Sequence, residues 1–415
     1  MAEQSSPDLK ASDYVHLHNH THYSVLDGMQ KVPEMLDRVQ ALGMEAVAIT
    51  DHGTLSGVIE FYKEATARGI KPIIGMETYV AARGMGDKDP VKDKARYHLI
   101  LLAMNNKGYE NLMRLSSTAW LEGYYYKQRI DRTVLQKYNE GLIVLSACLG
   151  GELGEHFMAD QDEKAYEVAK WYKQVFGDRY YIEIQDSGHL DHPASSKDQL
   201  KLNTKLHKLS KDLGIKLVLT SDAHYASPED KEAQDILLCV QTGAFLSDQG
   251  RFSMKDYDLF VEDPKTIIQR WGSEFGDAIK TTREIADRCD VKLELGGILI
   301  PKFPVPKGET EKTLLDKLVY RGVAERYLNM TREEAEKLSI DDVRAKTDKA
   351  VLERVDYELS VIDGMGFNGY MLIVQDFINW GKAQGIIFGP GRGSAAGSII
   401  AYTLCITDLC PLTYG

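Results

Sequence analysis

Short apolar runs alternate with helical patterns through the first 225 residues. Runs such as AVAIT at 46–50 and KLVLT at 216–220 are apolar without alternation, which is typical of strands buried on both faces. The segments between such runs, for example 31–42 and 200–213, place apolar residues at helical spacing. About seven strand-then-helix units in succession predict a parallel sheet covered by helices, closed or nearly closed into an α/β barrel. The expected strands are 16–20, 46–50, 72–76, 98–104, 142–147, 180–184 and 216–220.

Residue types that bind metal ions recur at the ends of these expected strands. The carboxyl ends of the strands in such a barrel meet at one rim, where its active sites lie. His98 is an exception, because it begins its expected strand. Nine donors are too many for one tetrahedral zinc ion and suit a multinuclear centre with bridging carboxylates. The nine candidates are His18, His20, Asp27, His52, Glu77, His98, Cys148, Asp222 and His224.

The most concentrated of these signals is the stretch 16–28, HLHNHTHYSVLDG, with histidine at every second position from His16 to His22. Residues two apart on an extended segment point the same way, so their imidazoles can converge on one point. One at a time, such residues have ordinary explanations, since an Asp caps a helix, a Cys fills a core and a His packs or is solvated. Their recurrence at one rim favours a metal centre over a chance histidine-rich tract. His16, His22 and Asp51 lie outside the candidate ligand set.

Composition and charge narrow the class of protein. The net charge of −12 argues against a broadly basic surface, so nucleic acid would bind through a local patch or through metal ions. The five cysteines are scattered without a CxxC pair, which argues against a disulfide framework or a cysteine zinc finger and fits a reducing cytosol. No apolar run approaches the roughly 18 residues of a membrane span, and the N-terminus lacks the apolar segment of a signal peptide. We therefore expect a cytoplasmic protein without a membrane partner.

The second half of the sequence is expected to be mostly helical. A connector with several prolines at 293–308 separates it from the barrel, and helical patterns follow at 311–328 and 371–384. Thr331 and Glu334 form a capping box for a further helix. This half therefore predicts a separate, helix-rich domain.

One glycine-rich stretch in this half carries a chemical signal. Residues 385–404, GIIFGPGRGSAAGSIIAYTL, predict a strand, a loop and a helix. Backbone N–H groups in such a loop at a helix N-terminus form an anion site, and Arg392 adds a fork that suits phosphate. The loop is not a Walker A motif, because no GK[ST] sequence ends it.

Several of these motifs together resemble a known family. HLHNHTHYSVLDG, AITDHG, IIGMETYV, VLSAC and LTSDAH are similar to the successive motifs of the PHP (polymerase and histidinol phosphatase) domain, over about residues 15–225. The resemblance implies a distorted seven-stranded α/β barrel that holds three metal ions and has metal-dependent phosphoesterase activity. It also implies that the nine candidates above are the metal ligands. Among them we expect Asp27, His52 and Asp222 to carry the catalysis, with Asp51 orienting a neighbouring ligand.

A second resemblance covers the end of the sequence. Residues 370–412, YMLIVQDFINWGKAQGIIFGPGRGSAAGSIIAYTLCITDLCPL, are similar to the start of the palm in the catalytic α subunit of bacterial DNA polymerase III. The resemblance implies that Arg392, Gly393 and Ser394 contact the triphosphate of the incoming nucleotide. A PHP domain without an inserted exonuclease resembles the DnaE type of α subunit rather than the PolC type.

The expected domain organisation is a PHP domain at 1–290 followed by the start of the polymerase palm at 291–415. The family's polymerase aspartates lie downstream of the glycine loop, so we interpret this sequence as an N-terminal fragment of a DNA-directed DNA polymerase. The resemblance implies that the complete polymerase binds the primer 3′ end of DNA, a deoxynucleoside triphosphate and magnesium. It also implies binding to replisome subunits, the sliding clamp and the clamp loader, through regions outside this sequence.

Three functions remain open for the PHP site. Clustered divalent ions activate water and stabilise charge on a phosphoryl group, and a polymerase presents the 3′-terminal phosphodiester of DNA, which favours a proofreading 3′→5′ exonuclease. A structural metal module without chemistry is the second hypothesis, and the complete ligand set argues against it. A small-molecule phosphatase of the histidinol-phosphatase type is the third, and the palm segment argues against it. The mixed donor set favours two or three ions of zinc, manganese or iron.

Overall fold

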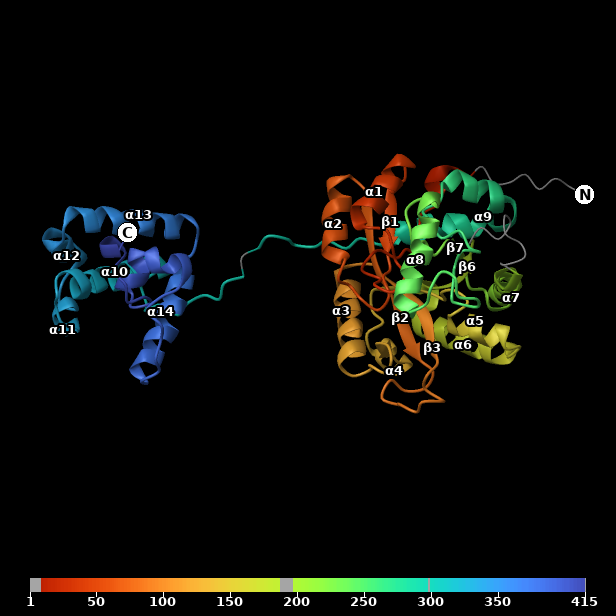
Figure 1. The fold of residues 1–415 in the computed structure, drawn as a ribbon, viewed down its shortest axis with the longest axis horizontal. Coiled ribbons are helices and arrows are strands. Elements are labelled where there is room, and N and C mark those ends of the chain that lie inside the picture. Colours follow the sequence, from red (N-terminus) through yellow and green to blue (C-terminus); the bar gives the residue numbers. More distant parts are fainter. Residues whose placement is uncertain (1–8, 187–196, 298, 415) are drawn as a thin grey trace, which may run out of the picture. The chain divides into compact units, whose positions relative to one another are not determined.

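The structure is a computed structural model that describes residues 9–186, 197–297 and 299–414. The chain divides into two compact units, Met1–Leu293 and Glu294–Gly415 (Figure 1). Each unit has its own cluster of buried apolar side chains. Within the described ranges, no helix is long and apolar enough to cross a membrane.

The first unit is built on a seven-stranded mixed sheet. The strands pair in the order β1, β2, β3, β5, β6 and β7, and the short β4 pairs with the C-terminal half of β2. Most strand residues are buried, as apolar runs between layers of helices predict. The bounds are β1 (Ala46–Ile49), β2 (Lys71–Ala81), β3 (Arg96–Ala103), β4 (Arg129–Ile130), β5 (Leu142–Leu145), β6 (Tyr180–Gln185) and β7 (Leu217–Thr220).

The segment expected as the first strand closes this sheet into a barrel. The backbone of residues 16–20 lies between β1 and β7 and forms hydrogen bonds with both. On one side, the N–H groups of Ala48 and Thr50 donate to carbonyls of this segment, each at 2.9 Å. On the other side, Ala223 exchanges two backbone hydrogen bonds with it, at 2.7 and 3.2 Å. The predicted α/β barrel is therefore confirmed, with residues 16–20 as its closing segment.

The prediction of an all-parallel sheet is wrong at β3, which runs antiparallel to both β2 and β5. The strand expected at 72–76 continues to Ala81, and residues 82–95 lead into β3 without a helix. Parallel neighbours need a crossover to the far end of the strand, usually through a helix, so a chain without one returns antiparallel. The beginning of β3 therefore lies at the same rim as the ends of the parallel strands, which removes the exception at His98.

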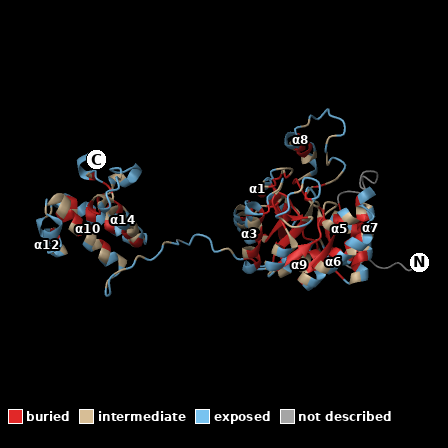
Figure 2. Ribbon diagram, turned by 90° about the horizontal axis from the view of Figure 1, so that it is seen from below, coloured by how far each residue is buried: buried red, intermediate tan, exposed pale blue. Residues whose placement is uncertain are grey.

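Helices surround the sheet, and Figure 2 shows buried residues in the strands and on the inward faces of these helices. One cluster of buried side chains fills the barrel, among them Ile73 and Ile100. Ile285 of α9 joins this cluster, and Arg288 donates to the Tyr181 hydroxyl at the beginning of β6. α9 therefore covers the barrel end where the parallel strands begin. The helices are α1 (Val32–Ala41), α2 (Val58–Ala67), α3 (Asn106–Leu121), α4 (Arg132–Lys137), α5 (Glu152–Met158), α6 (Asp162–Phe176), α7 (Lys197–Leu213), α8 (Lys231–Thr242) and α9 (Pro264–Arg288), with 3-10 turns η1 (Ala11–Asp13), η2 (Gly177–Arg179) and η3 (Pro228–Asp230).

The described part of the second unit is helical, around a core that includes Val319, Val355 and Ile400. The capping box predicted for Thr331 and Glu334 is confirmed. The Thr331 hydroxyl accepts from the Glu334 N–H at 3.3 Å, and the Glu334 carboxylate accepts from the Thr331 N–H at 2.9 Å. The elements are α10 (Glu311–Tyr327), α11 (Arg332–Ala335), α12 (Ile340–Lys346), α13 (Lys349–Gly364), α14 (Asn368–Ala383), the 3-10 turn η4 (Gly393–Gly397), α15 (Ile399–Thr403) and α16 (Pro411–Tyr414).

The strand predicted before the glycine-rich loop is wrong. Residues 386–389 have no regular structure, and Ile387 is almost fully exposed. An apolar run becomes a stable strand only beside a partner, and residues 299–414 contain no strand that could pair with it. The helix after the loop is also short, because α15 has five residues.

Candidate metal centre

His18, His20 and Asp222 face one another at the open rim of the barrel. The two histidines come from the closing segment, and Asp222 follows β7. The Nε2 atoms of His18 and His20 lie 3.1 Å apart, and Asp222 Oδ1 lies 3.1 Å from the first and 3.2 Å from the second. Separations of about 3 Å are what ligands bound at about 2.0–2.2 Å around one ion produce. The i, i+2 spacing on extended backbone explains why the two imidazoles converge.

Glu77 of β2 connects these three residues to a second group, which is formed by His98 of β3 and Cys148 after β5. Its Oε1 lies 2.8 Å from His98 Nδ1, and Cys148 Sγ lies 3.7 Å from the same nitrogen. Its Oε2 lies 2.5 Å from His52 Nδ1 and 3.4 Å from His20 Nε2. The sequence predicted Glu77 directly after the end of its strand, whereas Glu77 lies inside β2. Both oxygens of one buried carboxylate therefore face imidazoles, as a bridging ligand requires.

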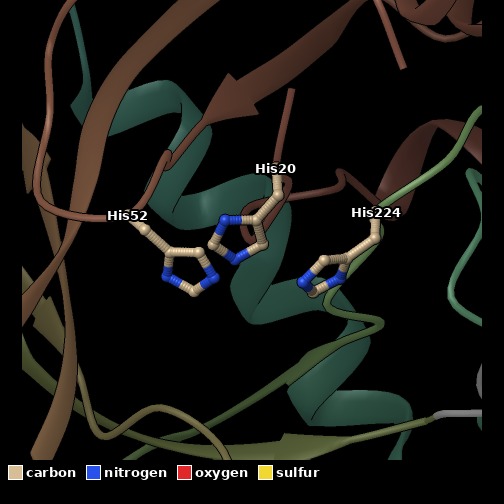
Figure 3. A group of neighbouring side chains, drawn as sticks. All are labelled: His20, His52 and His224. Carbon is tan, nitrogen blue, oxygen red and sulfur yellow. The ribbon is translucent and has the colours of Figure 1, made fainter. Parts of the chain in front are cut away.

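Asp27, His52 and His224 lie on a third side of the same group. Figure 3 shows the imidazoles of His20, His52 and His224 next to one another, from three separate segments. The ring centroid of His20 lies 4.1 Å from that of His52 and 4.4 Å from that of His224. Asp27 Oδ1 lies 3.2 Å from His52 Nε2 and 3.9 Å from His224 Nε2. The structure thus brings all nine candidate ligands into one connected group at the rim.

The donor atoms of this group fit divalent metal ions. Four buried atoms in it lack a hydrogen-bond partner, although other members of the group lie within 4 Å of each. A buried polar atom without a hydrogen bond destabilises a fold by about 1–3 kcal/mol, and a bound cation supplies the missing partner. Imidazole, carboxylate and thiolate together are a donor set for transition metals. The four atoms are Asp27 Oδ1, His52 Nδ1, Glu77 Oε2 and Asp222 Oδ1.

Burial and the mixture of charges shift pKa values within the group. Burial lowers the pKa of His18, but the surrounding carboxylates, Asp222 foremost, outweigh burial and raise the pKa to about 10. Burial and the neighbouring imidazoles lower the pKa of His20 to about 3. Burial raises the pKa of the Cys148 thiol well above its usual range. Without a metal ion, His18 is therefore an imidazolium at neutral pH, whereas His20 is neutral and has a lone pair free for a cation.

Glu183 contacts the candidate centre from behind and was not among the residues predicted from the sequence. It lies in β6 and is fully buried, and its Oε1 lies 2.7 Å from His18 Nδ1. The same carboxylate accepts from the Thr220 hydroxyl at 2.5 Å and from the Ala147 N–H at 3.0 Å. Glu183 therefore holds His18 with Nε2 toward the centre, as carboxylates behind metal-bound histidines do. The signal for it was one charged residue inside an otherwise uncharged buried strand, YYIEIQ.

Asp51 reaches the centre through Ser24. Its Oδ1 accepts from the Ser24 hydroxyl at 2.8 Å, and this hydroxyl lies 3.0 Å from His20 Nδ1. Asp51 therefore orients His20 from behind, as expected for a residue that supports a ligand. The other two histidines of the stretch lie apart from the centre, because His16 bonds to a backbone carbonyl at 3.0 Å and His22 is exposed.

Asp222 has a backbone φ of 52°, in the left-handed region. Few residues other than glycine adopt this conformation, and Asp and Asn tolerate it best. The carbonyl of Asp222 lies 2.7 Å from His224 Nδ1, which leaves His224 Nε2 toward the centre. The turn after β7 thus presents two candidate ligands from one short segment.

The predicted nucleotide-binding residues lie in the second unit. Arg392, Gly393 and Ser394 are exposed, and Gly393 begins the 3-10 turn η4 with a φ of 56°. The Glu358 carboxylate accepts from two N–H groups at the start of α15, each at 3.3 Å. The predicted anion site at this helix N-terminus is therefore filled by the chain's own carboxylate, while the loop residues themselves remain exposed.

Known proteins match both units. Residues 16–187 match the PHP domain family model, and residues 313–415 match the model described as the bacterial DNA polymerase III alpha NTPase domain. DNA polymerase III subunit alpha from Borreliella burgdorferi is 41% identical over 407 residues, which is 97% of this chain and 33% of the relative. The corresponding subunit from Thermus aquaticus is 40% identical over 451 residues, which is 97% of this chain and 36% of the relative. Over nearly its whole length, the chain is similar to bacterial DNA polymerase III α subunits.

The chain spans about a third of the length of the curated relatives it matches. An amidohydrolase from Chromobacterium violaceum, solved with sulfate and no metal, is 18% identical with a TM-score of 0.34, covering 52% of this chain and 89% of its own. A two-domain protein from Bacteroides vulgatus that contains a predicted PHP-like metal-dependent phosphoesterase is 17% identical with a TM-score of 0.33, covering 53% and 55%. The residues that match the PHP model contain seven of the nine candidate ligands, and Asp222 and His224 follow them.

Proposed function

We propose that residues 1–290 form a metal-dependent phosphoesterase domain that removes nucleotides from the 3′ end of DNA, a 3′→5′ exonuclease that proofreads for the polymerase. The observation that carries this proposal is the convergence of nine nitrogen, oxygen and sulfur donors at the open rim, four of them with a buried atom that lacks a hydrogen bond. The similarity to DNA polymerase III α subunits supports DNA as the substrate, because a polymerase continually presents the 3′-terminal phosphodiester of its primer.

In this proposal the ligands divide into an inner and an outer set. The side chains of His18 and Glu77 are almost inaccessible, whereas those of Asp27, His52 and Asp222 are 18, 8 and 14% exposed toward the rim. The inner set fixes the positions of the ions, and the outer set borders the place where a phosphodiester can enter. When bound, divalent ions supply Lewis-acid stabilisation of a phosphoryl group and a more acidic water. We therefore assign Asp27, His52 and Asp222 to catalysis.

We propose that the centre takes two or three ions of zinc, manganese or iron. Five imidazoles and one thiolate stand among the nine donors, and these ligands suit such ions better than magnesium, which prefers oxygen donors and water. Glu77 is placed to bridge two of the ions, because its two oxygens face different imidazoles. The separate groups His18–His20–Asp222 and Glu77–His98–Cys148 give at least two positions for an ion.

For the whole protein, we propose a DNA-directed DNA polymerase that acts on DNA in the cytoplasm. Residues 291–415 would begin its palm, with Arg392, Gly393 and Ser394 at the triphosphate of the incoming deoxynucleotide and magnesium at a polymerase site outside this sequence. The exposed loop at 392–394 is compatible with this role. The primer 3′ end, the sliding clamp and the clamp loader would be its partners.

The experiment is digestion of a 5′-labelled single-stranded oligonucleotide by the purified chain, with and without chelator. Metal-replete wild type should shorten the strand from its 3′ end, and Asp27→Asn should abolish digestion because the carboxylate charge is lost. Asp287→Asn, on the exposed surface of α9, is the matched control and should digest at the wild-type rate. Digestion that continues unchanged in Asp27→Asn would reveal a contaminating nuclease and leave the proposal without support.

The same preparation separates the two alternative functions. A structural metal module predicts no digestion by metal-replete wild type and a lower melting temperature in Asp27→Asn. A small-molecule phosphatase predicts hydrolysis of a phosphate monoester such as p-nitrophenyl phosphate without digestion of DNA. Either pattern would overturn the exonuclease.

A further inference from the structure

Arg96 is a cation next to the metal centre, and one of its hydrogen-bond donors lacks a partner. Arg96 lies on β3 two residues before His98, so both side chains leave the same face of the strand. Its guanidinium lies 5.6 Å from the centroid of the Tyr79 ring, and this ring lies 5.9 Å from that of His52, within 15° of parallel. Arg96 Nε is buried and has no hydrogen-bond partner. Arg96 Nη1 donates to the Lys94 carbonyl at 3.4 Å, and among the described residues Arg96 forms no ion pair, so the partly exposed end of its guanidinium can bind an anion from outside.

Lys127 is a second cation in the same region. The next residue, Gln128, donates from its side-chain amide to the His52 carbonyl at 3.1 Å, which places Lys127 on a segment that borders the centre. A tight turn presents it, because the Tyr125 N–H donates to the Lys127 carbonyl at 3.0 Å. Tyr126, between them, has a φ of 60°, an unfavourable conformation for an aromatic residue. Such strain persists where a fold must present particular side chains.

Exposed aromatic rings continue from this turn onto the end of α3. Trp120 and Tyr124 are both half-exposed and stack with their centroids 5.8 Å apart and their planes 17° from parallel. Trp120 Nε1 donates to the Gly53 carbonyl at 3.1 Å, directly after the candidate ligand His52. Tyr126 is 62% exposed. Trp120 is therefore anchored next to His52, Tyr124 stacks on it, and all three rings are exposed to solvent.

We propose that Arg96, Lys127, Trp120, Tyr124 and Tyr126 form a ledge that binds single-stranded DNA and leads its 3′ end into the metal centre. This inference rests on the proposed exonuclease function and states how its substrate is held. The two cations bind phosphates near the scissile one, and the rings stack on unpaired bases, the combination used by proteins that bind single strands. In a chain of net charge −12, such a local patch supplies the attraction that the surface as a whole lacks.

The ledge gives the site a preference for frayed ends. Bases in a duplex stack on one another and do not offer their faces to protein rings, whereas the last bases of a mismatched primer are free to do so. A strand that is paired to its 3′ end should therefore bind more weakly than the same strand alone. This preference is what a proofreading site needs.

The test is equilibrium binding of a 5′-fluorescein oligothymidylate with phosphorothioate 3′ linkages to the full, metal-replete chain, across a salt series. The double variant Arg96→Gln/Lys127→Gln should bind about tenfold or more weakly, and the slope of log affinity against log salt should fall by about 1.4, since each phosphate contact to a single strand contributes about 0.7. Tyr124→Ala should bind about fivefold or more weakly with an unchanged slope, because stacking is not ionic. Tyr124→Phe keeps the ring and should bind as wild type does.

Two matched variants control for charge and aromatic loss elsewhere. Lys164→Gln/Lys170→Gln removes two exposed charges from α6, and Tyr357→Ala removes an exposed ring from α13. Both should bind as wild type does. Metal content and melting temperature are measured for every variant. If the Arg96 variant loses metal because of its neighbour His98, the comparison of Tyr124→Ala with Tyr124→Phe decides the proposal.

The outcomes separate the ledge from the nuclease. Wild-type affinity and salt slope in the ledge variants, with metal retained, overturn the ledge whether or not the chain cuts DNA. Equal affinity for single-stranded and fully paired ends overturns it as well. Binding that depends on the ledge, together with no digestion of an ordinary oligonucleotide, supports the ledge and contradicts the exonuclease.

Discussion

Glu183 Oε1 lies 2.7 Å from His18 Nδ1, and both side chains are completely buried inside the barrel. The pair places an anion behind one imidazole of the candidate metal centre and fixes which ring nitrogen faces the other ligands. Among the candidate ligands in the described part of the chain, Glu183 hydrogen-bonds to His18 alone, so its effect on the centre passes through that ring.

Replacement of this carboxylate tests its supporting role. Glu183→Gln should lower metal affinity or nuclease activity by about 10–100-fold, because the amide is nearly isosteric but lacks the charge that holds the His18 ring. Isothermal titration of the metal-free chain with zinc measures the first quantity and oligonucleotide digestion the second. Glu284→Gln, a partly exposed carboxylate paired with Lys216, is the control. Wild-type affinity and rate in Glu183→Gln would show that His18 needs no such support.

The left-handed backbone at Asp222 predicts an asymmetry between two substitutions that both remove the carboxylate. Asp222→Asn should fold as wild type does once metal is stripped, because Asn tolerates a φ of 52°. Asp222→Val should lower the free energy of unfolding by a further ~1–2 kcal/mol, because a β-branched residue is strained there. Denaturant unfolding of the two metal-free variants measures the difference. Equal stability would mean that the turn after β7 relaxes freely.

Metal binding should release protons. Carboxylates around His18 raise its pKa to about 10, and burial raises the pKa of the Cys148 thiol, so both are protonated in the metal-free chain at pH 7.5. Both must lose a proton to bind an ion, so zinc affinity should rise as the pH is raised from 7 to 9. Titration calorimetry in buffers of different ionisation enthalpy gives the number of protons released, and Cys148→Ala should release fewer than wild type. An affinity that is flat with pH would exclude both residues as ligands.

These 415 residues alone should not extend a primer. One carboxylate, Asp408, follows the glycine-rich loop, and it is held by Arg326 and Lys382, each at 2.9 Å. Nucleotidyl transfer with two metal ions needs more than one such ligand. A standard primer-extension assay with magnesium and deoxynucleoside triphosphates checks this. Primer extension by this chain would contradict the prediction and would mean that Asp408 leaves its ion pairs and acts together with a further carboxylate.

Much of the barrel could be predicted from the sequence, because its strands and helices bury apolar residues in regular patterns. The runs at 46–50, 142–147 and 216–220 became β1, β5 and β7, with boundaries shifted by one or two residues. The direction of β3 was lost, since an apolar run has the same pattern in both directions and only the connection at 82–95 decides it. The short elements β4, α4 and α5 carry too few residues for a periodic signal.

The candidate ligands could be found from the sequence because each is a metal-binding residue type beside a buried strand. The residues behind them are harder to find, since Glu183 is recognisable only once its strand is known to enclose the centre. Arg96 and Lys127 could not be recognised from the sequence. What distinguishes them is that they form no ion pair in the described part of the chain, which only the structure shows. The strand predicted at 385–389 did not form. Its residue pattern suited a strand, but no partner strand lies in residues 299–414.

The central claim is that nine side chains at the barrel rim hold a multinuclear metal centre. The most direct measurement is anomalous diffraction from crystals of metal-replete protein, with data on both sides of the zinc, manganese and iron absorption edges. The account predicts two or three peaks within this group of side chains, with the neighbouring ions about 3.5–4 Å apart. One ion should lie among His18, His20 and Asp222, and another should lie at Glu77, His98 and Cys148. Replete crystals that show no anomalous peak among these residues would contradict it.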